Sequence, residues 1–259
     1  SIKHLFRTHT LIAGTLFLTA SGLISRILGF FYRIYLSRTI GAEGLGIYQM
    51  VFPIYGICFS LCAGSIQTAI SRFTAANREK AKQTLFCGFC ISFSLSLILA
   101  ILIRNQADFL AVHILMEPQC APLLPALALA IPFTSLHACV CGYFYGRNQV
   151  QLPAVSQLFE QCVRIFTVFL VVDIYRSAGH EVTAVVAVWG LLAGEAFSAL
   201  FVLSGFFIVS GSIPSALNRH SPIASFRATA APLMALAVPL MANRLVLNLL
   251  QSAEAVMLR

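Results

Sequence analysis

The amino-acid sequence predicts an all-α membrane protein, a polytopic bundle of about seven transmembrane helices. The first observation is composition: 59% of the 259 residues are hydrophobic and only 10% are charged, whereas soluble domains carry about 25% charged residues. The second is a mean hydropathy of +0.86. The third is that the apolar residues gather in runs of about 20, the length that a helix needs to cross about 30 Å of hydrocarbon.

Each apolar run is expected to form one helix, because lipid offers no hydrogen-bond partner to an open sheet edge. The first run follows a basic start, but it is too long for the apolar core of a signal peptide and other runs follow it. We therefore expect it to be retained as a span. The predicted spans are 11–36, 47–71, 83–104, 121–146, 154–175, 184–209 and 232–257.

The basic residues outside these spans are divided unevenly between the two sides of the predicted bundle. One side holds Lys3, Arg7, Arg72, Arg78, Lys80, Lys82, Arg147, Arg219 and Arg227. The other side holds Arg38, Arg104, Arg176 and Arg259, together with the acidic residues Asp108, Glu117, Asp173 and Glu181. Because cytoplasmic loops carry the excess of lysine and arginine, we expect a cell-membrane protein with its N-terminus and the connection 72–82 in the cytoplasm.

Span one carries two arginines at a depth where membrane helices rarely hold a charge. Gly22, Arg26, Gly29 and Arg33 fall within about 60° of one another around a helix, so that small and cationic residues share one narrow stripe. Arginine at membrane depth usually faces a protein interior or a water-filled cavity. We therefore expect Arg26 to line a cavity, and Arg33 either to line it as well or to extend to the outer interface.

Spans five, six and seven carry further charged residues at membrane depth. Glu160 and Arg164 are four residues apart and can pair on one helix face. We expect both to line a substrate-binding cavity; the alternative is a pair that only joins two helices. Arg244 in span seven is expected to line the same cavity. Glu195 and Glu254 are candidates for ion coupling.

Few residues of this chain suit enzyme chemistry, a metal centre or nucleic-acid binding. Asp108 and Asp173 are the only aspartates, and the chain lacks a Gly-rich phosphate loop or a Ser/His/Asp set, so we expect no enzyme activity and no cofactor. Cys87 and Cys90 have the spacing of a metal motif, but no second pair in a polar loop completes it, and no metal is expected. His137 is expected to be a packed, hydrogen-bonding residue. The net charge is +8, but the sequence contains no nucleic-acid-binding motif. Nucleic acid is therefore not an expected partner.

Several stretches of the chain resemble one known family. The segment GTLFLTASGLISRILGFFYRIYLSRTIGAEGLGIYQMVFPIYG, residues 14–56, is similar to the start of the stage V sporulation protein B-like polysaccharide biosynthesis proteins. The resemblance continues in order through GSIQTAISRF, residues 64–73, and LALAIPFTSLHACVCGYFYGRNQVQLPAVSQLFEQCVRIF, residues 127–166. It covers almost the whole chain.

This resemblance implies the multidrug/oligosaccharidyl-lipid/polysaccharide exporter superfamily, whose members have two pseudo-symmetric lobes around a central cavity. By resemblance, residues 1–231 form a six-helix N-terminal lobe and residues 232–259 the first helix of a second lobe, so the chain is expected to be part of a longer protein. The whole protein would be a flippase for a lipid-linked oligosaccharide or a peptidoglycan or polysaccharide precursor. The family's substrate-binding arginines on span one are matched best by Arg26.

Two other functions remain compatible with these residues. A drug or cation antiporter of the same superfamily would need an acidic or aromatic cavity, which Glu160, Glu195 and Glu254 would allow. A non-transporting scaffold in cell-wall or spore assembly would need only packing. The expected partners are membrane lipid, a lipid-linked sugar pyrophosphate, and a second lobe or another chain.

Overall fold

The computed structural model describes the backbone of residues 2–210 and 222–257, and the side chains of residues 14–209, 226–248 and 250. Within these ranges every regular element is a helix and no strand is present. The all-α fold class predicted from the sequence is confirmed.

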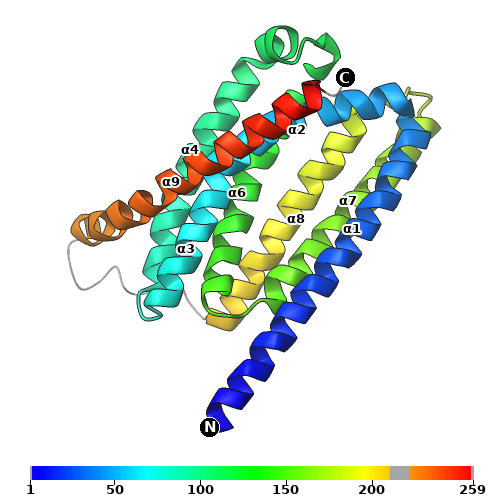
Figure 1. Ribbon diagram of the computed structural model, residues 1–259. Coiled ribbons are helices and arrows are strands. Elements are labelled where there is room, and N and C mark those ends of the chain that lie inside the picture. The colour runs from blue at the N-terminus through cyan, green and yellow to red at the C-terminus, as the bar shows by residue number, and fades with distance from the viewer. Residues whose placement is uncertain (1, 211–221, 258–259) are drawn as a thin grey trace.

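The helices form an elongated bundle in which most of the long elements run roughly side by side (Figure 1). In chain order they are α1 (Ile2–Met50), α2 (Phe52–Phe59), α3 (Ser65–Ala76), α4 (Ala81–Asn105), α5 (Ala107–Phe109), α6 (Leu124–Gly146), α7 (Gln151–Ser177), α8 (Val185–Ser210) and α9 (Pro222–Met257). Two π-helical turns, Ser60–Gly64 and Leu110–Ile114, and a short 3-10 turn, Pro118–Cys120, complete the described elements.

The first two membrane passes form one helical stretch that turns at Gly41. Six stretches of the described chain are long and apolar enough to cross a membrane, and the first of them, Gly14–Ala76, has 63 residues. A straight helix of that length would measure roughly 95 Å, about three times the hydrocarbon thickness. Gly41 interrupts it with φ of 77° and ψ of 172°, a conformation that glycine adopts readily. The chain then runs back through α2 and α3 (Figure 1), so this stretch contains two of the seven predicted spans.

Helix α6 lies at the centre of the bundle. It packs against α3, α4 and α8, and two glycines allow a close approach to α3. A Cβ atom on Gly142 would lie 2.6 Å from the backbone oxygen of Gln67, and one on Gly146 would lie 2.5 Å from that of Ser71. Because Cβ atoms do not approach oxygen so closely, α3 and α6 can hold this separation only while both positions are glycine.

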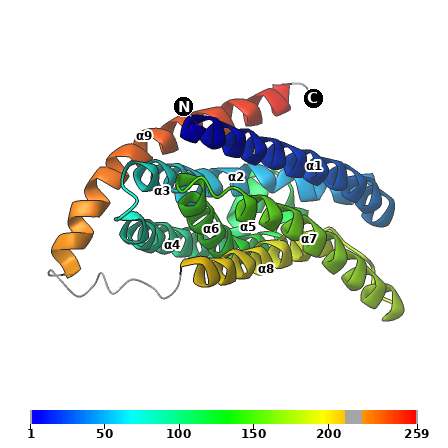
Figure 2. The ribbon, with the colours of Figure 1, turned by 90° about the horizontal axis from the view of Figure 1, so that it is seen from below.

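Helices α1, α7 and α8 form one side of the bundle (Figure 2). Helix α7 packs along α8 and also against α1. Gly190 and Gly194 of α8 face α7, where added Cβ atoms would lie 2.3 Å from Val168 Cγ2 and 3.1 Å from the backbone oxygen of Glu160. These small residues bring α8 close enough to α7 for charged side chains of the two helices to meet.

Helix α9 packs against α3 and α4 and begins earlier than expected. It starts at Pro222 rather than near 232, so Arg227 lies within the helix and not, as predicted, in the connection before it. Pro232 and Pro239 lie inside α9, where proline removes a backbone donor and disturbs the preceding turn. The helix is visibly bent along its length (Figure 2).

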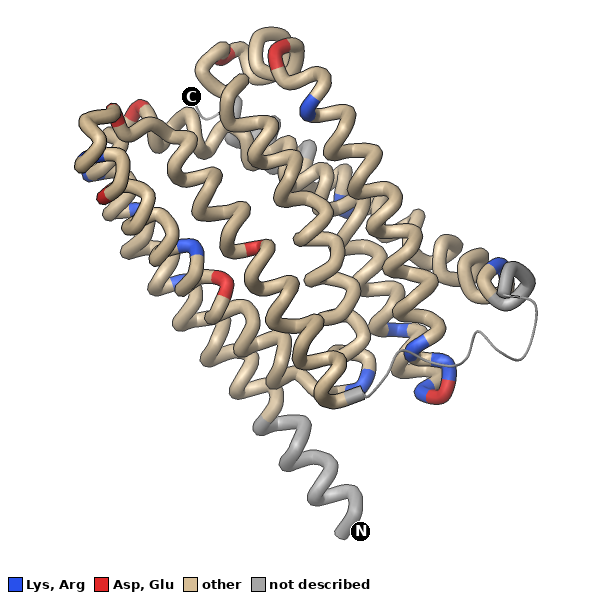
Figure 3. The backbone as a smooth tube through the Cα atoms, turned by 180° about the vertical axis from the view of Figure 1, so that it is seen from behind, with Lys and Arg blue, Asp and Glu red and all other residues tan. Residues whose placement is uncertain are grey.

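The charged residues of the connections lie at opposite ends of the bundle (Figure 3). Arg78 and Lys80 lie in the connection between α3 and α4, at the end of the bundle where α1 begins (Figure 1). The acidic residues of the α4–α6 and α7–α8 connections lie at the other end (Figure 3). The helices thus separate the basic and acidic connections as the sequence predicts, while the cytoplasmic placement of the basic end stays a prediction.

Candidate functional site

A cavity of about 400 Å³ lies between α1, the start of α2 and α7. Its charged and hydrogen-bonding lining residues are Arg26, Tyr32, Arg33, Tyr48, Gln49, Gln161 and Arg164. The turn at Gly41 shapes this cavity, because it brings Tyr48 and Gln49 back to the same space as Arg26 and Arg33. We call it the arginine cavity.

Arg26 and Arg33 supply exposed positive charge to the arginine cavity. Both lie on the stripe of α1 that the sequence predicts, and both are exposed. Between them, Gly29 leaves room beside α7, where an added Cβ atom would lie 3.6 Å from Gln161 Nε2. Neither guanidinium group forms an ion pair or a hydrogen bond in the described part of the chain. Their donors are therefore available to an anion.

Arg164 is the third cationic residue of the arginine cavity, and a carboxylate one helical turn away holds it. Arg164 Nη2 donates to Glu160 Oε1, and the two side chains are each 16% exposed. The i, i+4 pair expected from the sequence is therefore present. Arg164 Nε is buried and has no hydrogen-bond partner among the described residues. The pair leaves part of the guanidinium group unsatisfied at the cavity wall.

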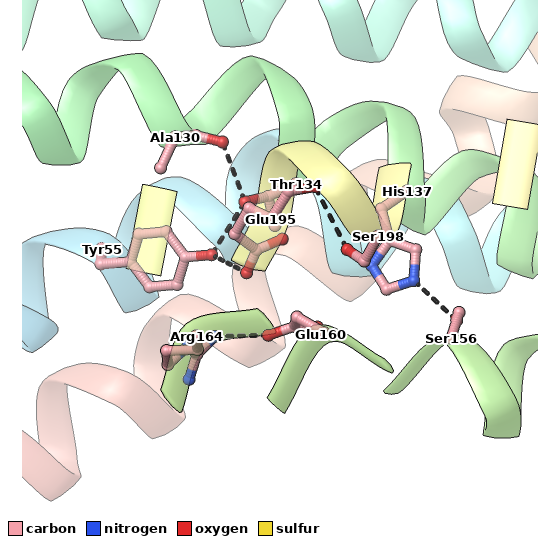
Figure 4. A network of polar contacts seen from close by, with 9 residues as sticks. All are labelled: Tyr55, Ala130, Thr134, His137, Ser156, Glu160, Arg164, Glu195 and Ser198. Atoms are coloured by element: carbon pink, nitrogen blue, oxygen red, sulfur yellow. Dashed lines mark hydrogen bonds and ion pairs between the residues drawn. The ribbon is translucent and has the colours of Figure 1, made fainter. Parts of the chain in front are cut away.

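A second polar group lies next to Arg164, in the interior of the bundle (Figure 4). His137 of α6, Glu160 of α7 and Glu195 of α8 each place one nitrogen or oxygen within 4.8 Å of those of the other two. Glu195 is 6% exposed, and Tyr55 Oη donates to its Oε1 at 2.8 Å. We call these three residues the carboxylate–histidine cluster.

Hydroxyl groups surround this cluster. Thr134 Oγ1 lies 2.8 Å from Tyr55 Oη and donates to the carbonyl oxygen of Ala130 at 3.0 Å. His137 Nε2 lies 3.0 Å from Ser156 Oγ, so His137 is a hydrogen-bonding residue, as the sequence predicts. These contacts hold the side chains of three different helices around one small polar space.

Arg244 lies apart from the arginine cavity. Its Nη2 donates to Thr68 Oγ1 at 3.2 Å, and the guanidinium group packs where Gly64 leaves space, since a Cβ atom there would lie 2.4 Å from Arg244 Nη1. One turn later, Asn248 Nδ2 donates to the carbonyl oxygen of Gly56 at 3.1 Å. Arg244 therefore joins α9 to the second membrane pass and is not among the residues that line the arginine cavity. Its expected role in substrate binding stays a prediction.

Five of the seven residues predicted for the site come together. They are Arg26, Arg33, Glu160, Arg164 and Glu195. The side chain of Glu254 lies outside the described residues. Tyr48 and Tyr55 are not among the residues predicted from the sequence, because tyrosines in an apolar run are typical of packing. Tyr55 reaches Glu195 across 140 positions of sequence, a relationship that no local pattern contains.

Residues 11–259 match the family described as polysaccharide biosynthesis protein. Stage V sporulation protein B of Bacillus subtilis (strain 168) is 30% identical over 247 residues, which cover 93% of this chain and 47% of that protein. Lipid II flippase MurJ of the same organism is 26% identical over 210 residues, which cover 74% of this chain and 38% of the flippase. The chain thus spans less than half the length of these relatives.

Two solved structures share the fold. A multidrug resistance MATE family transporter of the MOP superfamily, in an outward-facing conformation, superposes with a TM-score of 0.65 at 15% identity, over 91% of this chain and 52% of that chain. A MOP superfamily transporter from Pyrococcus furiosus superposes with a TM-score of 0.64 at 16% identity and the same coverage. At these identities the similarity shows the fold alone.

Proposed function

The chain belongs to the polysaccharide biosynthesis protein family, and from this premise we propose that the whole protein is a flippase that moves a lipid-linked sugar pyrophosphate across the cytoplasmic membrane. The cargo would be a lipid-linked oligosaccharide or a peptidoglycan or polysaccharide precursor. Similarity to a lipid II flippase supports this class of cargo. The transporter fold of the solved structures supports transport rather than catalysis as the role.

The observation that carries this proposal is the meeting of Arg26, Arg33 and Arg164 in one cavity. A pyrophosphate group is an anion with many acceptor oxygens, and guanidinium groups bind phosphate through two parallel hydrogen bonds. Because Arg26 and Arg33 have no internal partner in the described structure, an anion can bind them without first breaking an ion pair. Arg26 is the residue we expect to contribute most.

We further propose that α1 to α8 form a first lobe and that α9 begins a second. The solved transporter structures support this, because the fold similarity covers 91% of this chain but 52% of the transporter chain. The exposed side of the arginine cavity would then face the second lobe or another chain. With the N-terminus in the cytoplasm, an inside-negative potential would favour outward movement of an anion by about 2.3 kcal/mol per charge and 100 mV.

A drug or cation antiporter of the same superfamily is the second candidate, and Glu195 is the observation that favours it. Buried carboxylates within membrane bundles often mark ion pathways, and this one lies beside Glu160. The two candidates predict cargo of opposite charge. We favour the flippase because arginines line the cavity, whereas the carboxylates lie in the interior or are paired with Arg164.

Translocation by the complete protein in liposomes tests the proposal. A fluorescent lipid-linked disaccharide pyrophosphate is placed in one leaflet, and its arrival in the other is measured. We expect movement with the wild type, loss with Arg26→Ala, and retention with Arg38→Ala, which removes an exposed arginine of the same helix that does not line the cavity. Movement of a cationic dye without movement of the lipid would contradict the proposal and favour the antiporter.

A further inference from the structure

We propose that His137, Glu160 and Glu195 form a binding site for one divalent transition-metal ion of the manganese type. They come from α6, α7 and α8, and one ligand atom of each lies within 4.8 Å of the others. This departs from the sequence analysis, in which no metal is expected, because three residues on three separate helices make no spacing motif. The site is distinct from the arginine cavity, although the two adjoin.

Glu195 is the residue that points to a ligand. It is 6% exposed, and Tyr55 donates to its Oε1. Its Oε2 is buried and has no hydrogen-bond partner among the described residues, an arrangement that costs free energy unless a further partner is present. Figure 4 shows this carboxylate between Tyr55 and His137, with Glu160 facing it from α7. A cation in this space would satisfy the remaining oxygen.

The ligand set selects the kind of ion. Imidazole nitrogen suits first-row transition metals, carboxylate oxygen suits harder ions such as manganese, and calcium and magnesium prefer oxygen alone. At about 2.1 Å from an ion, two ligand atoms at coordination angles of about 90–120° lie about 3.0–3.6 Å apart. Separations of up to 4.8 Å therefore need to close by about 1–2 Å, which carboxylate side chains can do by rotation without movement of a helix.

Two neighbouring contacts orient the ligands. Glu160 Oε1 accepts from Arg164, and His137 Nε2 lies 3.0 Å from Ser156 Oγ. Histidines that bind metals commonly have one ring nitrogen held in this way, which sets the direction of the other. Glu160 and Glu195 each keep a protein contact through Oε1 and retain Oε2 for the ion. The imidazole of His137 also interacts with the thiol of Cys141, a contact that an ion would compete with.

Arg164 limits the affinity of this site. The two carboxylates carry two negative charges when the imidazole is neutral, and the guanidinium group paired with Glu160 offsets one of them. A nearby fixed positive charge opposes the binding of a cation. Removal of that charge should therefore strengthen metal binding. If the site instead needed Arg164 in order to bind the ion, the same change would weaken binding.

Titration of the 259-residue chain with Mn²⁺ tests the proposal, with loss of the six-line electron paramagnetic resonance signal of the free ion as the measure. The chain is purified without a polyhistidine tag. We expect one ion per chain, and at least tenfold weaker binding in Glu195→Gln, because this change removes the ligand charge but keeps an acceptor for Tyr55. Glu43→Gln changes an exposed glutamate of α1 and should leave the affinity unchanged. Equal affinity in Glu195→Gln and the wild type would overturn the proposal.

Two further measurements keep the proposal testable if Glu195→Gln does not fold. Electron spin echo of Mn²⁺ bound to the wild type should show modulation from an imidazole nitrogen, and its absence would overturn the site. Arg164→Gln should bind Mn²⁺ several-fold more tightly, and weaker binding would contradict the role assigned to Arg164. None of these measurements uses a lipid substrate, so failure of the metal site would leave the proposed transport intact, and the reverse also holds.

Discussion

Arg26 of α1 and Arg164 of α7 line the same cavity, although 138 positions separate them in the chain. The packing of α7 against α1 brings them together. Their states differ: Arg164 is held by Glu160, whereas Arg26 has no ion-pair partner within the described residues. Arg26 is therefore more available than Arg164 to an incoming anion.

Arg26→Ala should reduce the activity of the complete protein by tenfold or more. A hydrogen bond to a charged group contributes about 1.5–3 kcal/mol, which corresponds to roughly tenfold to a hundredfold. Arg26→Lys should restore only part of the activity, because a point charge replaces a two-pronged donor. The measurement is complementation of a strain that lacks the gene, with immunoblotting of membranes to show that insertion is unchanged. Full activity of Arg26→Ala would make this arginine a packing residue.

The sequence predicts those features that depend on neighbours along a single helix. The seven apolar runs become helices, the stripe with Arg26 and Arg33 lines one cavity, and Glu160 pairs with Arg164 one turn away. These relationships repeat with the period of the helix, so they are visible in the sequence.

Relationships between distant helices were not predictable in this way. Arg244 contacts Thr68 across 176 positions, and Tyr55 contacts Glu195 across 140. Both depend on the path of the chain after the turn at Gly41 and on how closely the helices approach. Hydrophobic periodicity describes neither the chain path nor the helix separations, so the contact of Arg244 with Thr68 could not be foreseen.

Gly142→Ala should destabilise the protein by about 1–3 kcal/mol, because overpacking of a close contact forces the neighbouring backbone to move. The added Cβ atom would lie 2.6 Å from the backbone oxygen of Gln67 and so push α3 away from α6. Gly22→Ala is the matched control, since a Cβ at that position would have no atom within 4 Å apart from its chain neighbours and the backbone of its own helix. The control should be neutral or stabilising by up to about 1 kcal/mol, the difference in helix propensity. Thermal unfolding in detergent compares the two, and equal melting temperatures would show that α3 and α6 are not in close contact.

Tyr55→Phe should also destabilise the protein, by about 1–3 kcal/mol, because Glu195 Oε1 would lose its donor in a buried position. Tyr175→Phe provides the comparison: this tyrosine is half-buried, and its hydroxyl group has no hydrogen-bond partner in the described structure. It should change the melting temperature little. If the two variants unfolded alike, the contact between Tyr55 and Glu195 would not contribute to stability.

The connection between α3 and α4 should lie in the cytoplasm. Outside the predicted spans, nine basic residues lie on the same side as this connection and four on the opposite side. Such an excess is typical of cytoplasmic loops. Two reporter enzymes, one active only inside the cell and one active only outside, are fused in turn near Ala76. Their activities show on which side of the membrane this connection lies. An external signal at this position would reverse the proposed orientation of the whole bundle.

The central claim is that the arginine cavity binds the pyrophosphate group of a lipid-linked sugar. The most direct measurement is equilibrium binding of a polyprenyl pyrophosphate to the purified complete protein, compared with the uncharged polyprenol of the same length. We predict that the wild type prefers the pyrophosphate, that Arg26→Ala lowers this preference by tenfold or more, and that Arg38→Ala leaves it unchanged. Equal binding of the pyrophosphate and the alcohol, or an unaltered preference in Arg26→Ala, would contradict the account.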